Sequence, residues 1–337
     1  MPRILLVNHL YHSDGEHLLR ESAEVVVADS DSLAALAPHL AGCDAIMART
    51  PARVSAEVIA AAPRLRVVST SGFGTDNIDI PAATAAGVLV VNNPGSAENS
   101  VAEHAVALIL ALAKKLTWSD GAVRSLKPWD FRGGFDAIEL RGRTLGVVGF
   151  GRIGREVARK MHEGFGMKIL AFDPMIDAAS VAAWAETSPT LESLLGRSDV
   201  VSVHCALTPE TRHLFNERTL GLMRPRAFLI NTARGPVVDG RALAAALSAG
   251  TLGGAGIDVY ESEPPAADNP LLAAQNAILT AHTAGLTVES ARQLAISAAT
   301  QVLAVLDGAR PANLINPEAW DQRRRAATAK PGSEDLG

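Results

Sequence analysis

The sequence predicts an α/β protein made of two doubly wound parallel-sheet domains with a cleft between them. Short β-branched runs alternate with alanine-rich helical stretches along the chain, which is typical of parallel strands joined by crossover helices. A length of 337 residues exceeds what one core usually serves, so we expect two domains. Hydrophobic residues make up 48% and charged residues 20%, as in globular proteins.

The first hundred residues contain five apolar runs that we expect to be strands. They lie at residues 3–8, 24–28, 45–48, 66–70 and 88–92. Helical stretches separate them, and the one over 55–62 offers Ser55 as its N-cap. A longer helix is expected from about residue 97 to 116, followed by a polar stretch that contains glycine and tryptophan.

A second series of strands follows, which makes the two halves look like copies of one architecture. We expect these strands at residues 144–150, 168–172, 200–205, 227–231, 254–259 and 277–281. A helix is predicted from about residue 288 to 307. Residues 318–337 carry few apolar side chains, so we expect a disordered tail.

Charge and cysteine content exclude several classes of partner. The net charge is −5, which does not favour binding to nucleic acid or to an anionic membrane. The longest apolar run, residues 105–113, is about half a membrane span. The only cysteines, Cys43 and Cys205, have no metal-binding spacing, so we expect no metal site and a reducing cytoplasmic location.

A glycine loop follows the first strand of the second series. Gly149, Gly151 and Gly154 have the GxGxxG spacing between an apolar strand and an apolar-periodic helix, which is the context that a dinucleotide loop requires. The first glycine permits the turn, the second lets pyrophosphate approach, and the third lets helix and strand pack closely. The helix N-terminus favours phosphate, and we expect Arg152 to add positive charge in the loop.

An acidic residue ends the next strand. Asp173 lies about 20 residues beyond the glycines, where a carboxylate binds both ribose hydroxyls and repels a 2′-phosphate. The sequence therefore predicts NAD, with NAD⁺/NADH preferred over the NADP forms.

Polar residues stand where three later strands end. Arg234, Asp258 and His282 each follow an apolar run, and Glu261 and Glu263 lie in the loop after Asp258. Ligands of open α/β sheets bind beyond the carboxyl ends of the strands. Arginine binds a carboxylate with a planar fork, and histidine is the usual acid or base near neutral pH. This combination suits the reduction of a 2-keto acid.

The sequence resembles the D-isomer-specific 2-hydroxyacid dehydrogenase family over roughly residues 40 to 316. The motifs that carry the resemblance stand in family order: SVAEHAVALILAL, GFGRIG, HCALTPETRHLFN, INTARGPVVD, DVYESEP and TAHTAG. The resemblance implies that Arg234, Glu263 and His282 are catalytic. It favours Glu263 over Glu261 because Glu263 precedes Pro264, as the family pattern requires.

The resemblance also implies further contacts with ligands. The substrate would be held by Arg49, Phe73, Gly74 and Arg234. Asp258 would hold the nicotinamide carboxamide. The other expected cofactor contacts are Gly149, Gly151, Arg152, Ile153, Gly154, Asp173, His204, Cys205, Thr211, Thr232, Ala233 and Gly285.

The expected organisation follows from these assignments. Residues 1–97 plus 289–317 would form a discontinuous substrate domain, and residues 98–288 would form the NAD-binding Rossmann domain. The resemblance implies a homodimer that interconverts a small D-2-hydroxy acid and its 2-keto acid. The phosphoglycerate, hydroxypyruvate and glyoxylate types remain open. An NADH-sensing binding protein of the same fold, like a corepressor, is the alternative.

Overall fold

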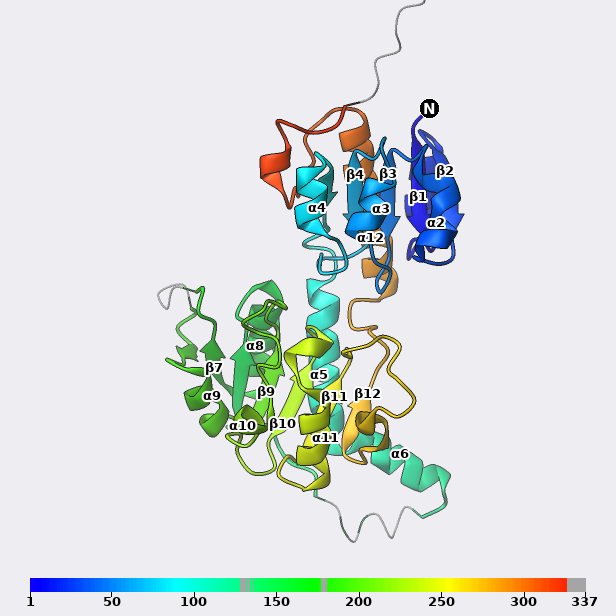
Figure 1. Cartoon of the computed structure of the whole chain (residues 1–337). Helices are drawn as coiled ribbons and strands as arrows, with labels where there is room; N and C mark the ends of the chain where they lie inside the picture. The colour runs from blue at the N-terminus through cyan, green and yellow to red at the C-terminus, as the bar shows by residue number, and fades with distance from the viewer. Residues whose placement is uncertain (128–131, 133, 135, 177–180, 326–337) are drawn as a thin grey trace, which may run out of the picture. The chain divides into compact units, whose positions relative to one another are not determined.

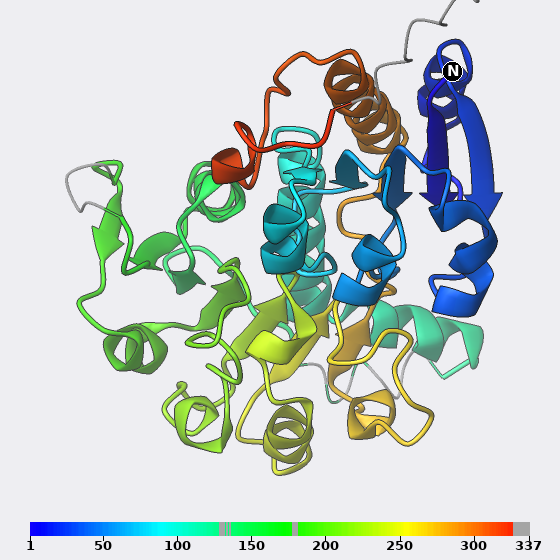
Figure 2. The same cartoon turned by 45° about the horizontal axis from the view of Figure 1, so that its top comes forward.

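The computed structural model describes residues 1–127, 132, 134, 136–176 and 181–325, and the chain divides into two compact units. Unit 1 comprises residues 1–97 and 287–337, and unit 2 comprises residues 98–286. Each unit is built on one parallel sheet with helices on both faces (Figures 1 and 2). The predicted fold class, α/β with two doubly wound sheets, is confirmed.

Unit 1 has a five-stranded sheet in the order β2-β1-β3-β4-β5. Its elements are β1 (Arg3–Val7), α1 (Ser13–Arg20), β2 (Glu24–Ala28), α2 (Leu33–Leu40), β3 (Ala45–Ala48), α3 (Ala56–Ala60), β4 (Val67–Thr70), α4 (Ile80–Ala85), β5 (Leu89–Val91), α12 (Val288–Leu306) and η4 (Pro317–Ala319). Every expected strand of this half is present. Ser55 caps α3 as predicted, because its hydroxyl accepts a hydrogen bond from Val58 N.

Both faces of this sheet are buried under helices, and successive residues of each strand pack on opposite faces. Leu5, Ile46 and Val68 pack under α2, α3 and α4, whereas Ile4, Met47 and Val67 pack under α1 and α12. Side chains alternate across a strand, so a strand covered on both faces is apolar at every position. This explains why the strands read as continuous apolar runs.

Unit 2 has a seven-stranded sheet in the order β12-β11-β10-β9-β6-β7-β8. Its elements are α5 (Glu98–Lys114), α6 (Leu116–Arg124), β6 (Thr144–Val148), α8 (Arg152–Phe165), β7 (Lys168–Phe172), β8 (Ala185–Thr187), α9 (Leu191–Arg197), β9 (Val200–Val203), α10 (Glu217–Leu220), β10 (Phe228–Asn231), η2 (Gly235–Val237), α11 (Gly240–Ser248), β11 (Gly254–Ile257), η3 (Pro270–Ala273) and β12 (Ala277–Leu279). The chain leaves β6 toward β7 and returns on the other side of β6 at β9, which makes the β6 edge a topological switch point.

Neither β8 nor α6 of unit 2 was predicted. β8 is a three-residue edge strand whose residues, Ala185, Glu186 and Thr187, do not form the apolar run that marks the other strands. α6 follows α5 after Lys115, whose φ of 55° ends the first helix, and none of its residues is buried within the chain. We therefore expected polar connecting chain where the structure has a second helix.

The prediction of a disordered tail from residue 318 is wrong for residues 318–325. Ala319 is fully buried, Arg323 stacks on Trp320, and Arg324 donates a hydrogen bond to Ala62 O at 2.8 Å. The bond between Arg324 and Ala62 joins residues far apart in sequence, so no local pattern predicts it. Residues 326–337 lie outside the described residues.

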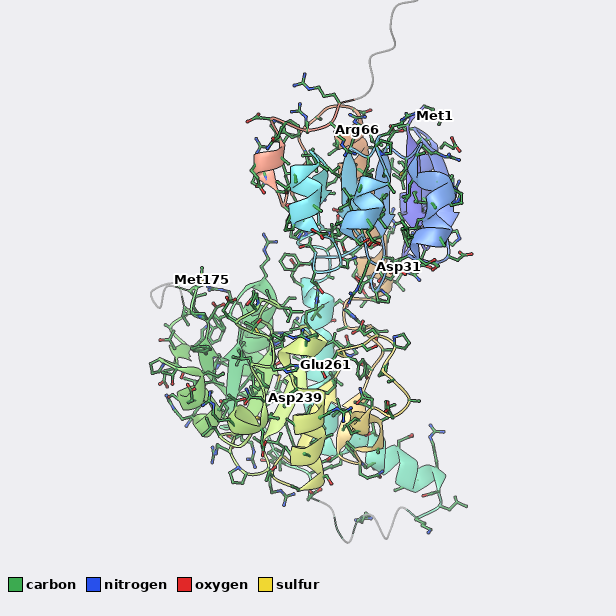
Figure 3. All side chains as sticks on the ribbon, viewed as in Figure 1. Met1, Asp31, Arg66, Met175, Asp239 and Glu261 are labelled. Atoms are coloured by element: carbon green, nitrogen blue, oxygen red, sulfur yellow. The ribbon has the colours of Figure 1, made fainter. Side chains whose placement is uncertain are left out.

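Arg66, which Figure 3 labels in unit 1, is a buried arginine with a structural function. Its guanidinium donates to Val305 O at 2.9 Å and to Leu306 O at 3.0 Å. These are terminal carbonyls of α12 that lack partners within the helix. Arg66 therefore ties the returning helix to β4.

Within the described residues, the structure contains no helix of the length and apolarity needed to cross a membrane.

Candidate active site

The glycine loop lies at the switch point of unit 2, after β6. Gly149 has φ +88°, and a Cβ there would lie 2.4 Å from Cys205 N. A Cβ at Gly154 would lie 2.1 Å from Gly149 O, so close packing of helix and strand requires glycine there. A Cβ at Gly151 would meet nothing within 4 Å, and Gly151 is the N-cap of α8. Open space therefore faces the free amides of this helix, as phosphate binding requires.

Arg152 begins α8 rather than lying in the preceding loop as we expected. Its guanidinium lies 3.6 Å from Glu98 at the start of α5, and its side chain is 70% exposed. Ile153 follows it and packs partly against the core under α5 and α8.

Asp173 directly follows β7, beside the glycine loop. Its carboxylate accepts hydrogen bonds from Phe150 N at 2.8 Å and from Met175 N at 2.9 Å. The carboxylate is therefore held by backbone donors of the glycine loop and of its own turn. The sequence did not predict this contact between Asp173 and Phe150, because the two residues follow different strands.

Two polar atoms near the same edge are buried without a hydrogen-bond partner among the described residues. They are His204 Nδ1, after β9, and Thr232 Oγ1, after β10. Buried polar atoms normally have partners, so an unsatisfied pair at the carboxyl edge of a sheet fits a bound polar ligand. With the open space at Gly151, these atoms fit the dinucleotide that the glycine loop implies.

Other expected cofactor contacts lie after β9 and after β12. Burial raises the pKa of the Cys205 thiol to about 11, so it stays protonated and unreactive near neutral pH. Thr211 donates its hydroxyl to Ala206 O at 2.7 Å and shapes the loop after β9. Gly285 follows the turn after β12.

His204 provides a test through acid stability. Burial lowers the pKa of His204 from 6.5 to about 3. The unfolded chain therefore binds this proton below about pH 6.5 and the folded chain does not until about pH 3, so stability is lost as pH falls through that window. Because one proton is involved, we expect the free energy of unfolding to fall by at most about 1.4 kcal/mol per pH unit. Urea unfolding at pH 7, 6 and 5 should give a shallower loss for His204→Asn than for the wild type. Parallel losses would contradict the assignment.

Arg234 is positioned by the side chain of Asn231, the last residue of β10. Asn231 is buried, its amide donates to Arg234 O at 3.0 Å, and its carbonyl accepts from Ala233 N at 3.0 Å. The Arg234 guanidinium donates to Ala233 O at 2.7 Å. The turn that presents Arg234 is thus braced from the strand.

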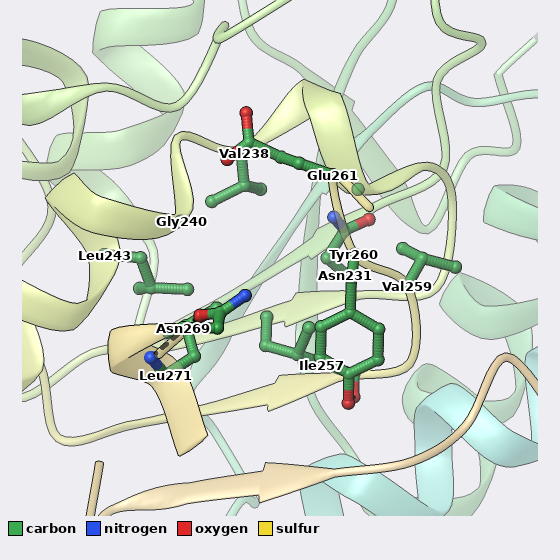
Figure 4. A pocket seen from close by; sticks show the side chains of 11 residues that line it. Asn231, Val238, Gly240, Leu243, Ile257, Val259, Tyr260, Glu261, Asn269 and Leu271 are labelled. Atoms are coloured by element: carbon green, nitrogen blue, oxygen red, sulfur yellow. Dashed lines mark hydrogen bonds between the residues drawn. The ribbon is translucent and has the colours of Figure 1, made fainter. Parts of the chain in front are cut away.

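The residue after Arg234 must be glycine. A Cβ at Gly235 would lie 1.9 Å from the carbonyl carbon of Tyr260. The turn after β10 therefore packs directly on the loop after β11. Behind this contact lies a cavity of about 20 Å³, with room for one water, and Figure 4 shows Asn231 and Tyr260 among the residues that line it.

The structure brings Glu263 and His282 together. Glu263 Oε2 lies 2.7 Å from His282 Nδ1, and Glu263 Oε1 accepts from Tyr260 N at 3.0 Å. Both side chains are partly buried, with 20% of Glu263 and 31% of His282 exposed. An ionised carboxylate only accepts hydrogen bonds, so Nδ1 of His282 carries a proton and Nε2 is left for other chemistry.

Glu261 has a different partner. Its Oε1 lies 2.6 Å from Nε2 of His213, on the loop before α10, and both side chains are about 40% exposed. Glu263 and not Glu261 contacts His282, and the catalytic role of Glu263 stays a prediction. This second pair supplies a matched control for experiments on the first.

Asp258 and Tyr260 support the same region. Asp258 is fully buried, and its carboxylate accepts hydrogen bonds from Thr280, Thr283 and Ala284, so these protein groups already hold it. Its contact with a carboxamide stays a prediction. Tyr260 donates to Thr280 O at 2.9 Å. Burial, with the nearby carboxylates of Asp258 and Glu263, raises the pKa of Tyr260 to about 12, so this donor keeps its proton.

The substrate contacts expected in unit 1 lie after β3 and β4. The Arg49 guanidinium lies over the Tyr11 ring, 5.1 Å from its centroid. Phe73 is 59% exposed, and its carbonyl accepts a hydrogen bond from Asn92 at 2.7 Å. Gly74 is the next residue. These residues share the carboxyl edge of the unit 1 sheet.

The fold and this set of residues define a nicotinamide-dependent oxidoreductase. The family model described as the D-isomer-specific 2-hydroxyacid dehydrogenase NAD-binding domain matches residues 106–284. The chain belongs to this family.

Relatives share most of the chain. It is 40% identical to a glyoxylate reductase from Thermofilum pendens, over 94% of this chain and 95% of that protein. It is 37% identical to a D-3-phosphoglycerate dehydrogenase from Methanocaldococcus jannaschii, over 94% of this chain but only 60% of that protein. An NADPH-dependent glyoxylate/hydroxypyruvate reductase from Sinorhizobium meliloti, solved with NADP and malonate, matches with a TM-score of 0.86 and 29% identity over 97% of this chain and 99% of that one.

Proposed function

We propose that the protein interconverts a small D-2-hydroxy acid and its 2-keto acid by reversible hydride transfer to and from NAD(H). The substrate is of the phosphoglycerate, hydroxypyruvate or glyoxylate type. The observation that carries this proposal is the 2.7 Å contact between Glu263 and His282, two strands from the strand end that bears Arg234. Family membership and the named activities of the relatives support it.

Each residue of this group has a distinct chemical task. Arg234 binds the substrate carboxylate through its planar guanidinium. His282 gives a proton to the keto oxygen, or takes it from the hydroxyl, through Nε2. Glu263 holds Nδ1 and stabilises the charged imidazole. When bound, the nicotinamide would supply or accept the hydride.

The cofactor would be held by the glycine loop, Asp173 and the polar atoms of His204 and Thr232. The free amides at the N-terminus of α8 suit the pyrophosphate, since they offer donors and partial positive charge. We place the substrate at Arg49, Phe73, Gly74 and Arg234. A cytoplasmic location is part of the proposal, supported by two cysteines that are both free thiols.

Oxidation of NADH by the purified protein tests the activity. The panel should contain glyoxylate, hydroxypyruvate, pyruvate, 2-oxoglutarate and phenylpyruvate, with 3-phosphoglycerate and NAD⁺ run in reverse. Turnover of one compound supports the proposal and identifies the substrate class. Tight NADH binding without turnover of any compound would instead favour the sensing function.

Asp173 should set the preference for NAD. We expect Asp173→Asn to raise the NADPH-to-NADH ratio of kcat/KM by at least about tenfold, because the charge that repels a 2′-phosphate is lost. Asparagine keeps an acceptor for Phe150 N, so the loop should persist. Steady-state kinetics with both cofactors provide the measurement. Glu186→Gln, on exposed β8, is the control. An unchanged ratio in Asp173→Asn would count against the assignment.

We also propose a homodimer, formed in part through α6. Val123 is 57% and Leu126 is 89% exposed, although both are apolar, and α6 extends from the sheet of unit 2 (Figure 1). Light scattering should give twice the chain mass of 35.2 kDa for the wild type and a lower mass for Val123→Glu. A wild-type protein with the mass of one chain would refute the dimer.

A further inference from the structure

The turn that carries His282 is held by the carboxylate of Asp258. Thr283 N donates to Asp258 Oδ1 at 3.0 Å, and Ala284 N donates to Oδ2 at 3.0 Å. His282 N donates to the backbone carbonyl of Asp258 at 2.7 Å. His282 itself has φ +53°, a left-handed conformation that residues with a side chain seldom adopt. Such a conformation persists only where surrounding contacts enforce it, and Asp258 makes those contacts.

Among the described residues, the Asp258 carboxylate has one further hydrogen-bond donor, the hydroxyl of Thr280. Thr280 Oγ1 donates to Asp258 Oδ1, while the Thr280 carbonyl accepts from Tyr260. Asp258 is fully buried, and a buried carboxylate is costly unless its oxygens accept hydrogen bonds. The orientation of the Thr280 hydroxyl therefore matters for the charge that holds the His282 turn.

His104, on α5, contacts the same hydroxyl. Its Nε2 lies 3.0 Å from Thr280 Oγ1 and 3.6 Å from Asp258 Oδ1. The Thr280 hydroxyl gives its proton to Asp258, so its oxygen must accept from His104. His104 therefore carries a proton on Nε2, as this network requires. Three side chains from α5, β11 and the end of β12 form one chain of hydrogen bonds that ends at the amides after His282.

We propose that His104 is a positioning residue for His282, acting through Thr280 and Asp258. This inference rests on the acid–base role proposed above for His282. Without the donor on His104, the Thr280 hydroxyl can rotate away from Asp258, and the carboxylate holds the turn less firmly. The His282 ring then occupies its productive geometry for a smaller part of the time. Small misplacements of reacting groups lower the rate strongly, so we expect the change in kcat rather than in the binding of NADH.

The test compares His104→Gln with His104→Leu in the full chain. Glutamine keeps an N–H donor, whereas leucine fills similar space without one. We expect His104→Leu to lower kcat about tenfold with less than a twofold change in KM for NADH, and His104→Gln to restore most of the rate. In a Thr280→Val background, His104→Leu should cause no further loss. Equal losses for leucine and glutamine, or additive losses with Thr280→Val, would overturn the proposal.

Two further measurements keep the test independent of folding and of substrate. If His104→Leu does not fold, Thr280→Val should reproduce the loss of kcat and Thr280→Ser should not. Amide hydrogen exchange at Thr283 and Ala284 should be faster in His104→Leu or Thr280→Val than in the wild type. Hydrogen exchange needs no substrate, so the exchange rates decide the positioning role of His104 whether or not a substrate is known. A wild type that reduces none of the tested acids would refute the proposed function alone. Unchanged exchange would refute the positioning role alone.

Discussion

Replacement of His282 by glutamine should lower kcat by about 100-fold to 10,000-fold while NADH still binds. Positioned acid–base catalysis contributes a factor of this size, and glutamine neither donates nor accepts a proton under these conditions. Glutamine can still donate a hydrogen bond from its side-chain amide to Glu263, so the loop after β11 should keep its conformation. The loss of kcat would therefore reflect the loss of proton transfer rather than a change in the fold.

The matched control is His213→Gln. His213 also pairs with a glutamate, Glu261 at 2.6 Å, but this pair is exposed and does not contact His282. We expect His213→Gln to keep kcat within about twofold, since exposed ion pairs contribute about 0–1 kcal/mol. Fluorescence titration with NADH and single-turnover reduction of the best keto acid provide the measurements. A His282→Gln enzyme with wild-type turnover would show that another group transfers the proton.

Replacement of Arg234 by glutamine should lower kcat/KM for the keto acid about 100-fold. A fork-like hydrogen bond between a guanidinium and a carboxylate is charge-assisted, and loss of one partner costs about 2–5 kcal/mol. Arg234→Lys keeps the charge without the planar fork and should recover only part of the loss. Steady-state kinetics with the keto acid varied at saturating NADH measure the effect.

The control for Arg234 is Arg241→Gln. Arg241 is an exposed arginine in the first turn of α11, and its backbone N–H, rather than its side chain, bonds to the N-cap Asp239. Arg241→Gln should leave kcat/KM for the keto acid unchanged. Full activity of Arg234→Gln would mean that the carboxylate is bound elsewhere, for example at Arg49. Equal losses in both variants would indicate a general effect of charge.

Much of the secondary structure followed from local patterns. Eleven of the twelve strands appear as apolar runs, and most of them are buried at neighbouring positions because helices cover both faces of each sheet. β8 was missed because its residues, Ala185, Glu186 and Thr187, do not form an apolar run. The tail after residue 317 was misjudged because Arg324 bonds to Ala62 and Leu65, more than 200 residues earlier.

The residues of the site also divide into those that the sequence predicted and those that it did not. The spacing of Gly149, Gly151 and Gly154 is a local backbone requirement, and the sequence alone predicts where the loop falls between strand and helix. The braces behind the site, Asn231 and Thr280, carried no such signal. Each is an ordinary polar residue at a strand end, and only its partner gives it a function.

The sequence by itself determined the order of strands and helices, the glycine loop and the residue types that end the strands. Periodicity and turn chemistry act between residues close along the chain, so they can be read directly. Only the tertiary structure decided which polar groups meet. Glu261 and Glu263 differ by two positions, yet one contacts His213 and the other His282. That choice depends on which strands lie side by side and how each loop leaves its strand, because hydrogen bonds form between neighbours in space.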